Sequence, residues 1–219
     1  MSKYFVMAAK EETGCPSGFY YVYLLNTFDA KTYKTGGYGK LPWYTGPKRY
    51  GTPIPPFPSD LFLVTENTKY EYDIRSGSSY FYVLSEKFAS IISEYKTNFI
   101  QISPVKYIDK NGDGVLGKSY FVGRTKPLKK EEVFDLHASK FVNESNYDFE
   151  LLKIKNEFNF DLFDTRYTAP IQFSLIISEK MKAHLEREGI KGVDFLDLDL
   201  LKLNKDQSTS NEKPTYDPI

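Results

Sequence analysis

The sequence predicts an α+β fold, in which a mostly antiparallel sheet is covered by a few helices. Short segments rich in aromatic and β-branched residues, such as KYFVMAA and FYYVYLL near the N-terminus, have the composition of strands. Two longer segments, at about 80–108 and 171–203, change from strand periodicity to helix periodicity and back. Many strands with few helices favour an antiparallel sheet, so we expect one α+β domain over residues 1–203.

The composition limits the class of partner. The chain has 219 residues with 29 basic and 29 acidic side chains, so its formal net charge is zero. A neutral chain has no overall electrostatic attraction to nucleic acid or to an anionic membrane. Cys15 is the single cysteine, which excludes an intramolecular disulfide, and no apolar run approaches the roughly 20 residues of a membrane-spanning helix. We therefore expect a cytoplasmic protein that binds neither nucleic acid nor a membrane.

Two N-terminal strands, at 3–9 and 19–25, precede a segment rich in Gly, Pro, Lys and Tyr. Residues 26–60 sustain no period of either kind, and each proline removes a backbone donor and favours extended geometry. The segment predicts a long irregular loop, and ordered loops of such length are often functional. Four of its residues belong to types enriched in binding hot spots: Trp43, Tyr44, Arg49 and Tyr50. The alternative is that they anchor the loop to the body of the protein.

Residues 80–108 predict a strand, a helix and a second strand. Apolar side chains recur at the spacing of one helical face, at Phe88, Ile91, Ile92 and Tyr95. Ser85 is placed as the N-cap of this helix, and Glu86 just inside it favours the positive end of the helix dipole. The residues that follow, FIQISPVKYI, have strand composition.

The next residues, DKNGDG at 109–114, resemble the start of a calcium-binding loop but fit a hairpin turn better. An EF-hand loop needs a bidentate Glu at its twelfth position, and counting from Asp109 that position is Tyr120. Both flanks have strand composition, and Asn-Gly and Asp-Gly tolerate the positive φ angles of tight turns. We therefore predict a hairpin here and no calcium site.

The segment at 171–203 repeats the pattern of 80–108. The tripeptide Ser-Glu-Lys at 85–87 recurs at 178–180, again directly after an apolar strand. Further positions correspond in the helix and in the second strand: Phe88 with Met181, Ile92 with Leu185, Ile100 with Val193, and Ile102 with Phe195. Agreement of cap, helix face and strand spacing indicates a repeated strand-helix-strand unit.

The remaining segments receive simpler interpretations. KKEEVFDLHASKF predicts a short helix or an ordered loop, and FELLKIK with FNFDLFD predicts a pair of strands. RSGSS at 75–79 is interpreted as a polar turn. Residues 204–219 contain almost no apolar side chains, so we expect a flexible tail.

Few residues suggest catalysis or metal binding. His184 falls on or near the packed face of the second helix, which indicates a partly buried structural histidine. His137 lies near Asp135 and Ser139, but residues two apart do not generally form a Ser-His-Asp relay. No pair of Cys or His has metal-ligand spacing, and the glycines of KTGGYGK lack the context of a phosphate-binding loop. We expect no catalytic residue, no metal and no cofactor.

Carboxylates interrupt the last predicted strand, VDFLDLDLL, at Asp194, Asp197 and Asp199. Their ordinary explanation is the solvent face of an edge strand, where charge discourages unwanted pairing. The alternative is a small negative patch for a basic partner.

Three stretches together resemble bacterial immunity proteins of polymorphic-toxin systems: IISEKMKAHLEREGIKGVDFLDL, YFYVLSEKFASIISE with ISPVKY, and LHASKF. The resemblance covers about residues 60–200, and the Pro-rich N-terminal third has no place in it. It implies a cytoplasmic protein without catalysis of its own, which binds one cognate toxin domain and blocks its active site or its access to substrate. The candidate toxin contacts are Trp43, Tyr44, Arg49, Tyr50, Asp197 and Asp199.

Two alternative functions remain open. The first is an enzyme of unfamiliar class, such as a hydrolase that uses His137. The second is a peptide- or glycan-binding module built on the aromatic loop around Trp43. The sequence does not determine the oligomeric state.

Overall fold

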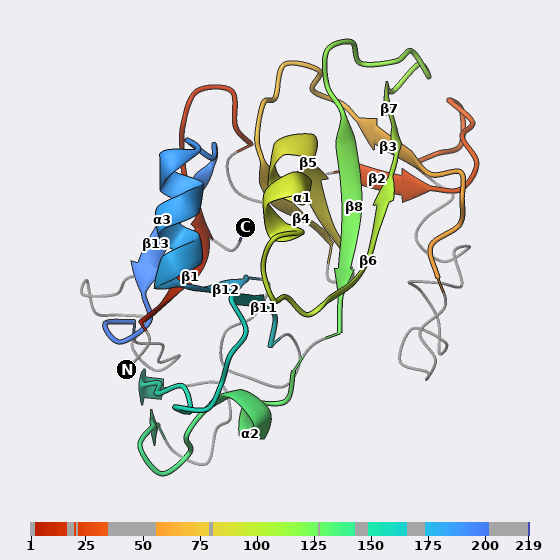
Figure 1. The fold of residues 1–219 in the computed structure, drawn as a ribbon. Coiled ribbons are helices and arrows are strands. Elements are labelled where there is room, and N and C mark those ends of the chain that lie inside the picture. The colour runs from red at the N-terminus through yellow and green to blue at the C-terminus, as the bar shows by residue number, and fades with distance from the viewer. Residues whose placement is uncertain are drawn as a thin grey trace.

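The computed structural model describes residues 3–16, 20, 22–34, 56–78, 81–126, 128–142, 149–165, 174–201 and 219. These residues form four sheets and three helices, and all strand pairs but one are antiparallel (Figure 1). The predicted α+β class with a mostly antiparallel arrangement and few helices is confirmed.

The first four-stranded sheet has the order β4-β5-β8-β6. Its strands are β4 (Ile74–Ser78), β5 (Phe81–Ser85), β8 (Tyr120–Thr125) and β6 (Phe99–Pro104). Helix α1 (Glu86–Ile92) links β5 to β6, which lie on the two sides of β8. The predicted cap is confirmed, because the Ser85 side chain accepts a hydrogen bond from the Phe88 N–H.

The second four-stranded sheet has the order β11-β12-β1-β13. Its strands are β11 (Leu162–Phe163), β12 (Ile176–Ser178), β1 (Tyr4–Ala9) and β13 (Val193–Asp197). Helix α3 (Glu179–Arg187) links β12 to β13, which lie on the two sides of β1. Ser178 caps this helix by accepting from the Met181 N–H. We call each sheet with its helix a half of the molecule.

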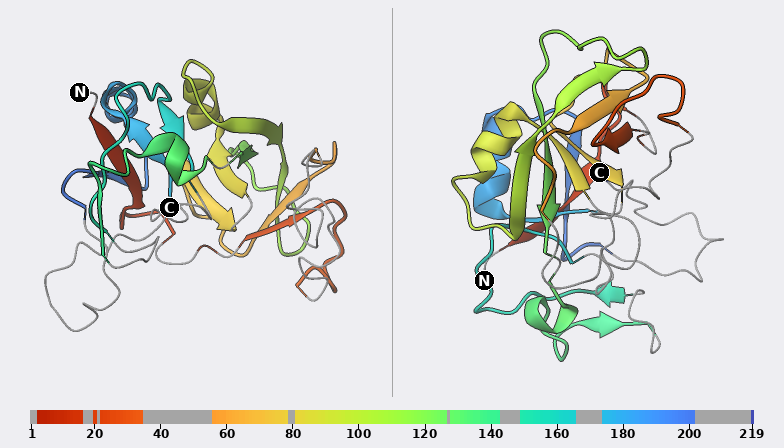
Figure 2. Two further views of the ribbon diagram at one scale, coloured as in Figure 1. Left: turned by 90° about the horizontal axis from the view of Figure 1, so that it is seen from below. Right: turned by 90° about the vertical axis from the view of Figure 1, so that its right-hand side faces the viewer.

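The two helices lie side by side and run in opposite directions (Figures 1 and 2). Near the start of α1, Lys87 Nζ donates to the Glu188 carbonyl after the end of α3. Beyond the other end of α1, the Tyr95 hydroxyl lies 2.8 Å from His184 Nδ1. The His184 side chain is only 14% exposed, so the prediction of a partly buried structural histidine is confirmed. Apolar residues of both helices share one core with both sheets, including Phe88, Ile91, Met181 and Leu185.

Each half packs against a second layer. The first half shares a tyrosine-rich core with a three-stranded sheet of β2 (Val22–Leu25), β3 (Phe62–Thr65) and β7 (Lys106–Asp109), in which β3 and β7 are parallel. The second half shares a phenylalanine-rich core with α2 (Lys130–Val133), β9 (Lys140–Phe141) and β10 (Phe149–Leu151). In Figure 1 these layers lie at the right and at the bottom of the molecule.

Several local predictions were wrong. FELLKIK and FNFDLFD do not pair with each other: β10 pairs with β9, and β11 pairs with the buried strand β12, where Leu162 and Phe163 are fully enclosed. RSGSS is not a polar turn, because Arg75 lies inside strand β4 and is 1% exposed. Gly77 makes this strand possible, since a Cβ there would lie 2.0 Å from the Phe81 ring.

The DKNGDG segment forms the predicted tight turn, but the strands on its two sides do not pair as a hairpin: β7 pairs with β3, β8 belongs to the first four-stranded sheet, and only an isolated bridge joins Ile108 to Gly114. Asp109 Oδ1 accepts from the backbone N–H groups of Asn111 and Asp113, and Gly112 has φ +94°. Val115 N–H then donates to the Tyr107 carbonyl, which closes the turn. Burial opposes ionisation of Asp109, but these hydrogen bonds lower its pKa. The aspartate therefore serves the turn itself.

Several predictions concern residues that are only partly described. The long loop was placed at 26–60; residues 35–55 lie outside the described part, and residues 26–34 and 56–60 contain neither helix nor strand. Of the predicted tail at 204–219, only Ile219 is described, and it is 2% exposed in the core that both helices share. The single domain at 1–203 and the derivation of both halves from one repeated unit stay predictions.

Candidate functional site

Four of the six candidate toxin contacts lie outside the described residues: Trp43, Tyr44, Arg49 and Tyr50. Their assignment stays a prediction. The other two, Asp197 and Asp199, lie at the end of β13 and in the turn that follows it.

Both aspartates are paired with lysines. Lys3 Nζ lies 2.7 Å from Asp197 Oδ2, and Lys153 Nζ lies 3.0 Å from Asp199 Oδ2. Burial opposes the charge on Asp197, but the hydrogen bond from Lys3 lowers its pKa, and the same bond raises the pKa of Lys3. A cavity of about 650 Å³ opens beside them, and its lining includes Lys3, Lys153, Lys155 and Asp199 together with apolar residues such as Phe158. The carboxylates therefore belong to a mixed, internally compensated surface.

The neighbourhood of His137 does not form a relay. The Asp135 carboxylate accepts from the backbone N–H groups of His137 and Ala138. Ser139 Oγ accepts from the Lys153 N–H at 3.0 Å. These contacts occupy the carboxylate and the hydroxyl with backbone partners, while the His137 residue is exposed. The arrangement explains the three residues as a structured turn.

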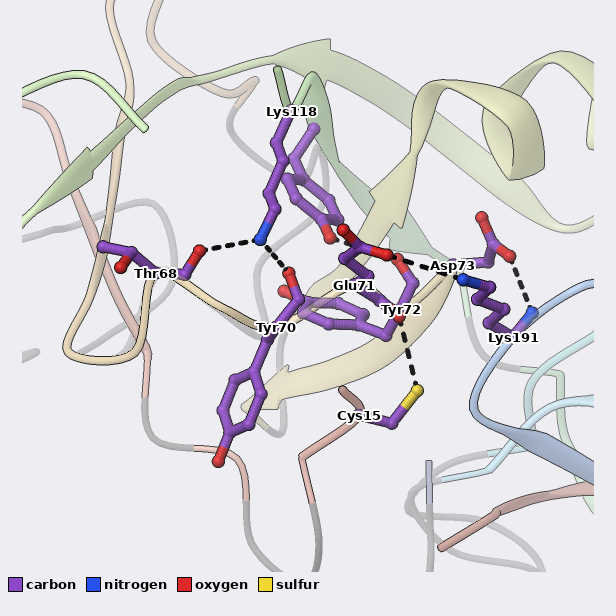
Figure 3. A network of polar contacts seen from close by, with 9 residues as sticks. Cys15, Thr68, Tyr70, Glu71, Tyr72, Asp73, Lys118 and Lys191 are labelled. Atoms are coloured by element: carbon purple, nitrogen blue, oxygen red, sulfur yellow. Dashed lines mark hydrogen bonds and ion pairs between the residues drawn. The ribbon is translucent and has the colours of Figure 1, made fainter. Parts of the chain in front are cut away.

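A polar cleft of about 340 Å³ lies between the two halves and contains a network of charged side chains (Figure 3). Lys118 Nζ donates to the carbonyls of Thr68 and Tyr70. Lys191 makes two hydrogen bonds. Its backbone N–H donates to Asp73 Oδ2 at 2.7 Å, and its Nζ donates to Glu71 Oε2 at 3.5 Å. The two lysines thus hold the segment 68–73 between the turn before β8 and the turn before β13.

Asp73 has a counterpart in the other half. Ser85 Oγ donates to Asp73 Oδ1 at 2.6 Å, and Ser178 Oγ donates to Asp161 Oδ1 at 2.8 Å. Each aspartate also reaches across to the opposite half: Asp73 accepts from the Lys191 N–H, and Asp161 accepts from the Lys96 N–H at 3.3 Å. These reciprocal bonds fix how the halves meet and assign the cleft a structural role.

Buried polar residues lie behind this cleft. Arg75 donates to the carbonyls of Ile74, Gly192, Lys10 and Pro16. Burial lowers its pKa, and the nearby Cys15 thiol has its own pKa raised by burial. Arg75 therefore joins backbone segments of both halves. The sequence offered little sign of this, because a single arginine among serines has the composition of a turn.

Exposed apolar side chains point to a different part of the surface. Among the described residues, the large apolar side chains most exposed to solvent are Ile100, Ile102, Leu116, Leu136 and Leu200. Two of them, Ile100 and Ile102, lie on one strand, β6, at the edge of the first sheet. Their register with Val193 and Phe195 was noticed in the sequence, but their exposure was not predicted.

Within the described part of the chain, no cluster of three or more His, Cys, Asp or Glu side chains has the arrangement of a metal site. In the same residues, no helix has the length and apolar character needed to cross a membrane. The described surfaces that remain are the compensated charges around β13, the cleft between the halves, and the apolar edge of β6.

Comparison with known proteins assigns the chain to a family. A family model described as Immunity protein 43 matches residues 42–205, which is well over half of the 219-residue chain. No curated protein matches the chain. The matched region includes all three helices and every described strand except β1 and β2. The chain therefore belongs to the Immunity protein 43 family.

Proposed function

We propose that this protein neutralises a cognate bacterial toxin domain by binding it directly. The family match over residues 42–205 carries this proposal. Direct binding requires no reactive group in the inhibitor, only a surface that covers the toxin's active site or its route to substrate. The turn geometry around His137 gives no support to the hydrolase alternative, because Asp135 and Ser139 are bonded to backbone groups.

The toxin belongs, in this proposal, to a polymorphic-toxin system, and the two proteins meet in the cytoplasm of the bacterium that is protected. The contact residues proposed from the sequence are Trp43, Tyr44, Arg49, Tyr50, Asp197 and Asp199. The ion pairs of the two aspartates weigh against a large contribution from them, since Lys3 and Lys153 already compensate their charge.

The proposal extends to the scaffold, which we infer to be two copies of one strand-helix-strand unit. Several matching features support this origin. Both four-stranded sheets place a helix-linked pair of strands around a central antiparallel strand. Both helices have a serine cap that donates to an aspartate just before the outer strand. A matching framework of this kind leaves the surface residues free to vary with the toxin.

Co-expression with the neighbouring toxin gene tests the function. We expect a toxin gene next to the gene for this protein, and we expect bacteria that express the toxin domain to grow only when this protein is present. The purified pair should form a one-to-one complex with an interface of at least about 1,000 Å². Growth arrest that persists when both proteins are produced in folded form would contradict the proposal. Rescue with no detectable complex would contradict direct binding.

A further inference from the structure

Strand β6 differs from the rest of the described surface in what it offers a partner. Among the described strands it pairs with β8 alone. Ile100 is 48% exposed and Ile102 is 36% exposed, and no charged residue lies between Thr97 and Val105. Single exposed apolar residues are ordinary on protein surfaces, but two of them on an edge strand make a template for another chain.

Among the described residues, the Ile102 backbone has no hydrogen-bond partner on the side of β6 that faces away from β8. Val105 N–H donates to the Tyr120 carbonyl, and the register pairs Ile102 with Gly123. Because backbone groups alternate in direction along a strand, the N–H and C=O of Ile102 point away from β8. Pro104 lies at an equivalent outward position, where its missing N–H removes no bond from the sheet.

The length of strand available to a partner is short. A register shift between Phe99 and Gln101 interrupts the ladder at one end, and Pro104 ends the row of outward donors at the other. Bulges and prolines are the features with which edge strands avoid indiscriminate pairing. Here the bulge and Pro104 leave about four residues, 100–103, for a partner strand. That length is enough to fix the register of one added strand but not to favour open-ended association.

Lysines lie at both ends of this uncharged stretch. Lys126 is exposed, and its backbone N–H donates to the Asn98 carbonyl beside the start of β6. Lys106 follows the end of β6, but its side chain is already paired with Asp60 at 3.3 Å, so the charge without a described partner is that of Lys126. A partner strand that is apolar at its centre and carries a carboxylate at the end beside Lys126 would complement this pattern.

We propose that β6 is the edge on which the toxin docks, by adding one extended strand with an apolar centre and an acidic residue at the end beside Lys126. The inference rests on the proposed function and names the surface that performs it. In the complex, the Ile102 N–H and C=O bond to the backbone of the toxin strand, and the Ile100 and Ile102 side chains lie beside apolar residues of that strand on the same face of the extended sheet.

Affinity for the toxin domain encoded by the neighbouring gene tests the surface. We expect Ile102→Lys to weaken the Kd measured by calorimetry at least tenfold, because it places a charge in an apolar contact. The matched control is Leu116→Lys, at a side chain that is 92% exposed elsewhere on the surface, and its Kd should equal that of the wild type. If the wild-type protein does not bind the toxin, the proposed function itself is contradicted. Wild-type binding with unchanged affinity in Ile102→Lys overturns only the docking edge.

Hydrogen exchange of the wild-type protein supplies a readout that does not depend on a variant. On addition of the toxin, the Ile102 amide should exchange at least tenfold more slowly by NMR. The Ser103 amide points toward β8, so its exchange should change much less. Equal exchange of Ile102 with and without toxin contradicts strand addition. A dimer in sedimentation that Ile102→Lys dissociates while toxin affinity is retained assigns the edge to a second copy, and also overturns the proposal.

Discussion

The two halves of the molecule share an arrangement of strands but end in edge strands of opposite character. In the second half, β13 carries Asp194 and Asp197, and Asp197 is paired with Lys3. In the first half, β6 carries no charge and exposes Ile100 and Ile102. Charge on an edge strand discourages pairing, whereas apolar residues invite it. The comparison teaches that a shared hydrogen-bonded framework does not determine the surface residues. The charges of β13 therefore discourage strand pairing, while the apolar residues of β6 leave that edge available to a partner strand.

The halves also differ at one interior position. Arg75 and Phe163 occupy equivalent positions, because each is the second residue of the outer strand of its sheet. Arg75 on β4 pairs with Val83, and Phe163 on β11 pairs with Ile176. One position holds a buried guanidinium that binds backbone carbonyls of both halves, and the other holds a fully buried aromatic ring. Substitutions at the two sites therefore separate the contribution of polar bonding from that of packing.

The largest expected effect on stability is that of Phe163→Ala. The ring is fully buried and contacts Tyr4 and Phe158 edge-on, so its removal leaves a cavity in the phenylalanine-rich core. We expect the free energy of unfolding in urea to fall by about 3–5 kcal/mol. Phe163→Leu, which refills part of the volume, is the control and should lose less. Equal losses for the two variants would show that volume is not what this position supplies.

Arg75→Met should destabilise the first half by at least about 2 kcal/mol, because it leaves several buried carbonyls without a donor. The same urea titration measures it. Arg75→Lys keeps the charge but offers fewer donors and no planar fork, so we expect an intermediate loss. Wild-type stability in Arg75→Met would mean that the cost of burying the guanidinium cancels its bonds.

The paired aspartates provide the most direct comparison of the halves. Asp73→Ala and Asp161→Ala each remove the acceptor for a cap serine and for a lysine N–H of the opposite half. We expect each to cost about 1–3 kcal/mol. Thermal and urea unfolding of both single variants and the double variant measure the effects. If one variant loses much more stability than the other, beyond the width of the range of about 1–3 kcal/mol, the two aspartates do not contribute equally to stability despite their matching contacts.

Alkaline pH should affect the first half more than the second, because its core holds several phenols. Burial raises the pKa of Tyr72 and Tyr20 well above the ordinary value, and it also raises the pKa of Tyr107. The unfolded chain therefore releases these protons first, and the free energy of unfolding falls as pH rises above about 10. Urea titrations at pH 8 and pH 10.5 should show this loss. Tyr72→Phe removes one phenol and should make the loss smaller, and an unchanged loss would exclude Tyr72 as a contributor.

The smallest effect should come from the charges of β13. Asp197→Asn removes an ion pair whose Lys3 side chain is 46% exposed, and such pairs contribute at most about 1 kcal/mol. We expect unfolding free energy within that limit and a nearly unchanged Kd for the toxin. A large loss of toxin affinity would restore Asp197 as a contact and would shift the docking surface toward the second half.

The sequence predicted those features that depend on local spacing. Ser85 and Ser178 were recognised as strand ends and helix starts, because a cap and a helical face lie within a few residues of each other. The tight turn at Asp109 followed from turn chemistry in the same way, whereas the pairing of its flanking strands was wrongly predicted. The wrong assignments involve partners far apart in sequence: β11 pairs with β12, which lies beyond residues 166–173, and Arg75 bonds to Gly192 and Pro16. Local composition carries no information about such partners.

The candidate site shows the same limit. The exposure of Ile102 depends on where β6 lies in a sheet whose neighbouring strand, β8, begins at Tyr120. Alternation of apolar and polar residues in FIQISP predicts a strand but does not say which side of it is covered. The charges of Asp197 and Asp199 were visible in the sequence, whereas their compensation by Lys3 and Lys153 required the fold.

The exchange of bonds between Asp73, Lys191, Asp161 and Lys96 has a consequence for how the chain can be divided. The turn before β6 contains Lys96, and the turn before β13 contains Lys191. In each turn the lysine N–H donates to an aspartate of the opposite half, so neither half contains the acceptor that its own turn requires. A single cut between β10 and β11 also leaves β1, the central strand of the second sheet, on the fragment that carries the first half. The two pieces should therefore remain unstructured alone and regain order on mixing. Measuring the order of each fragment alone and after mixing would show whether either one can fold without the other.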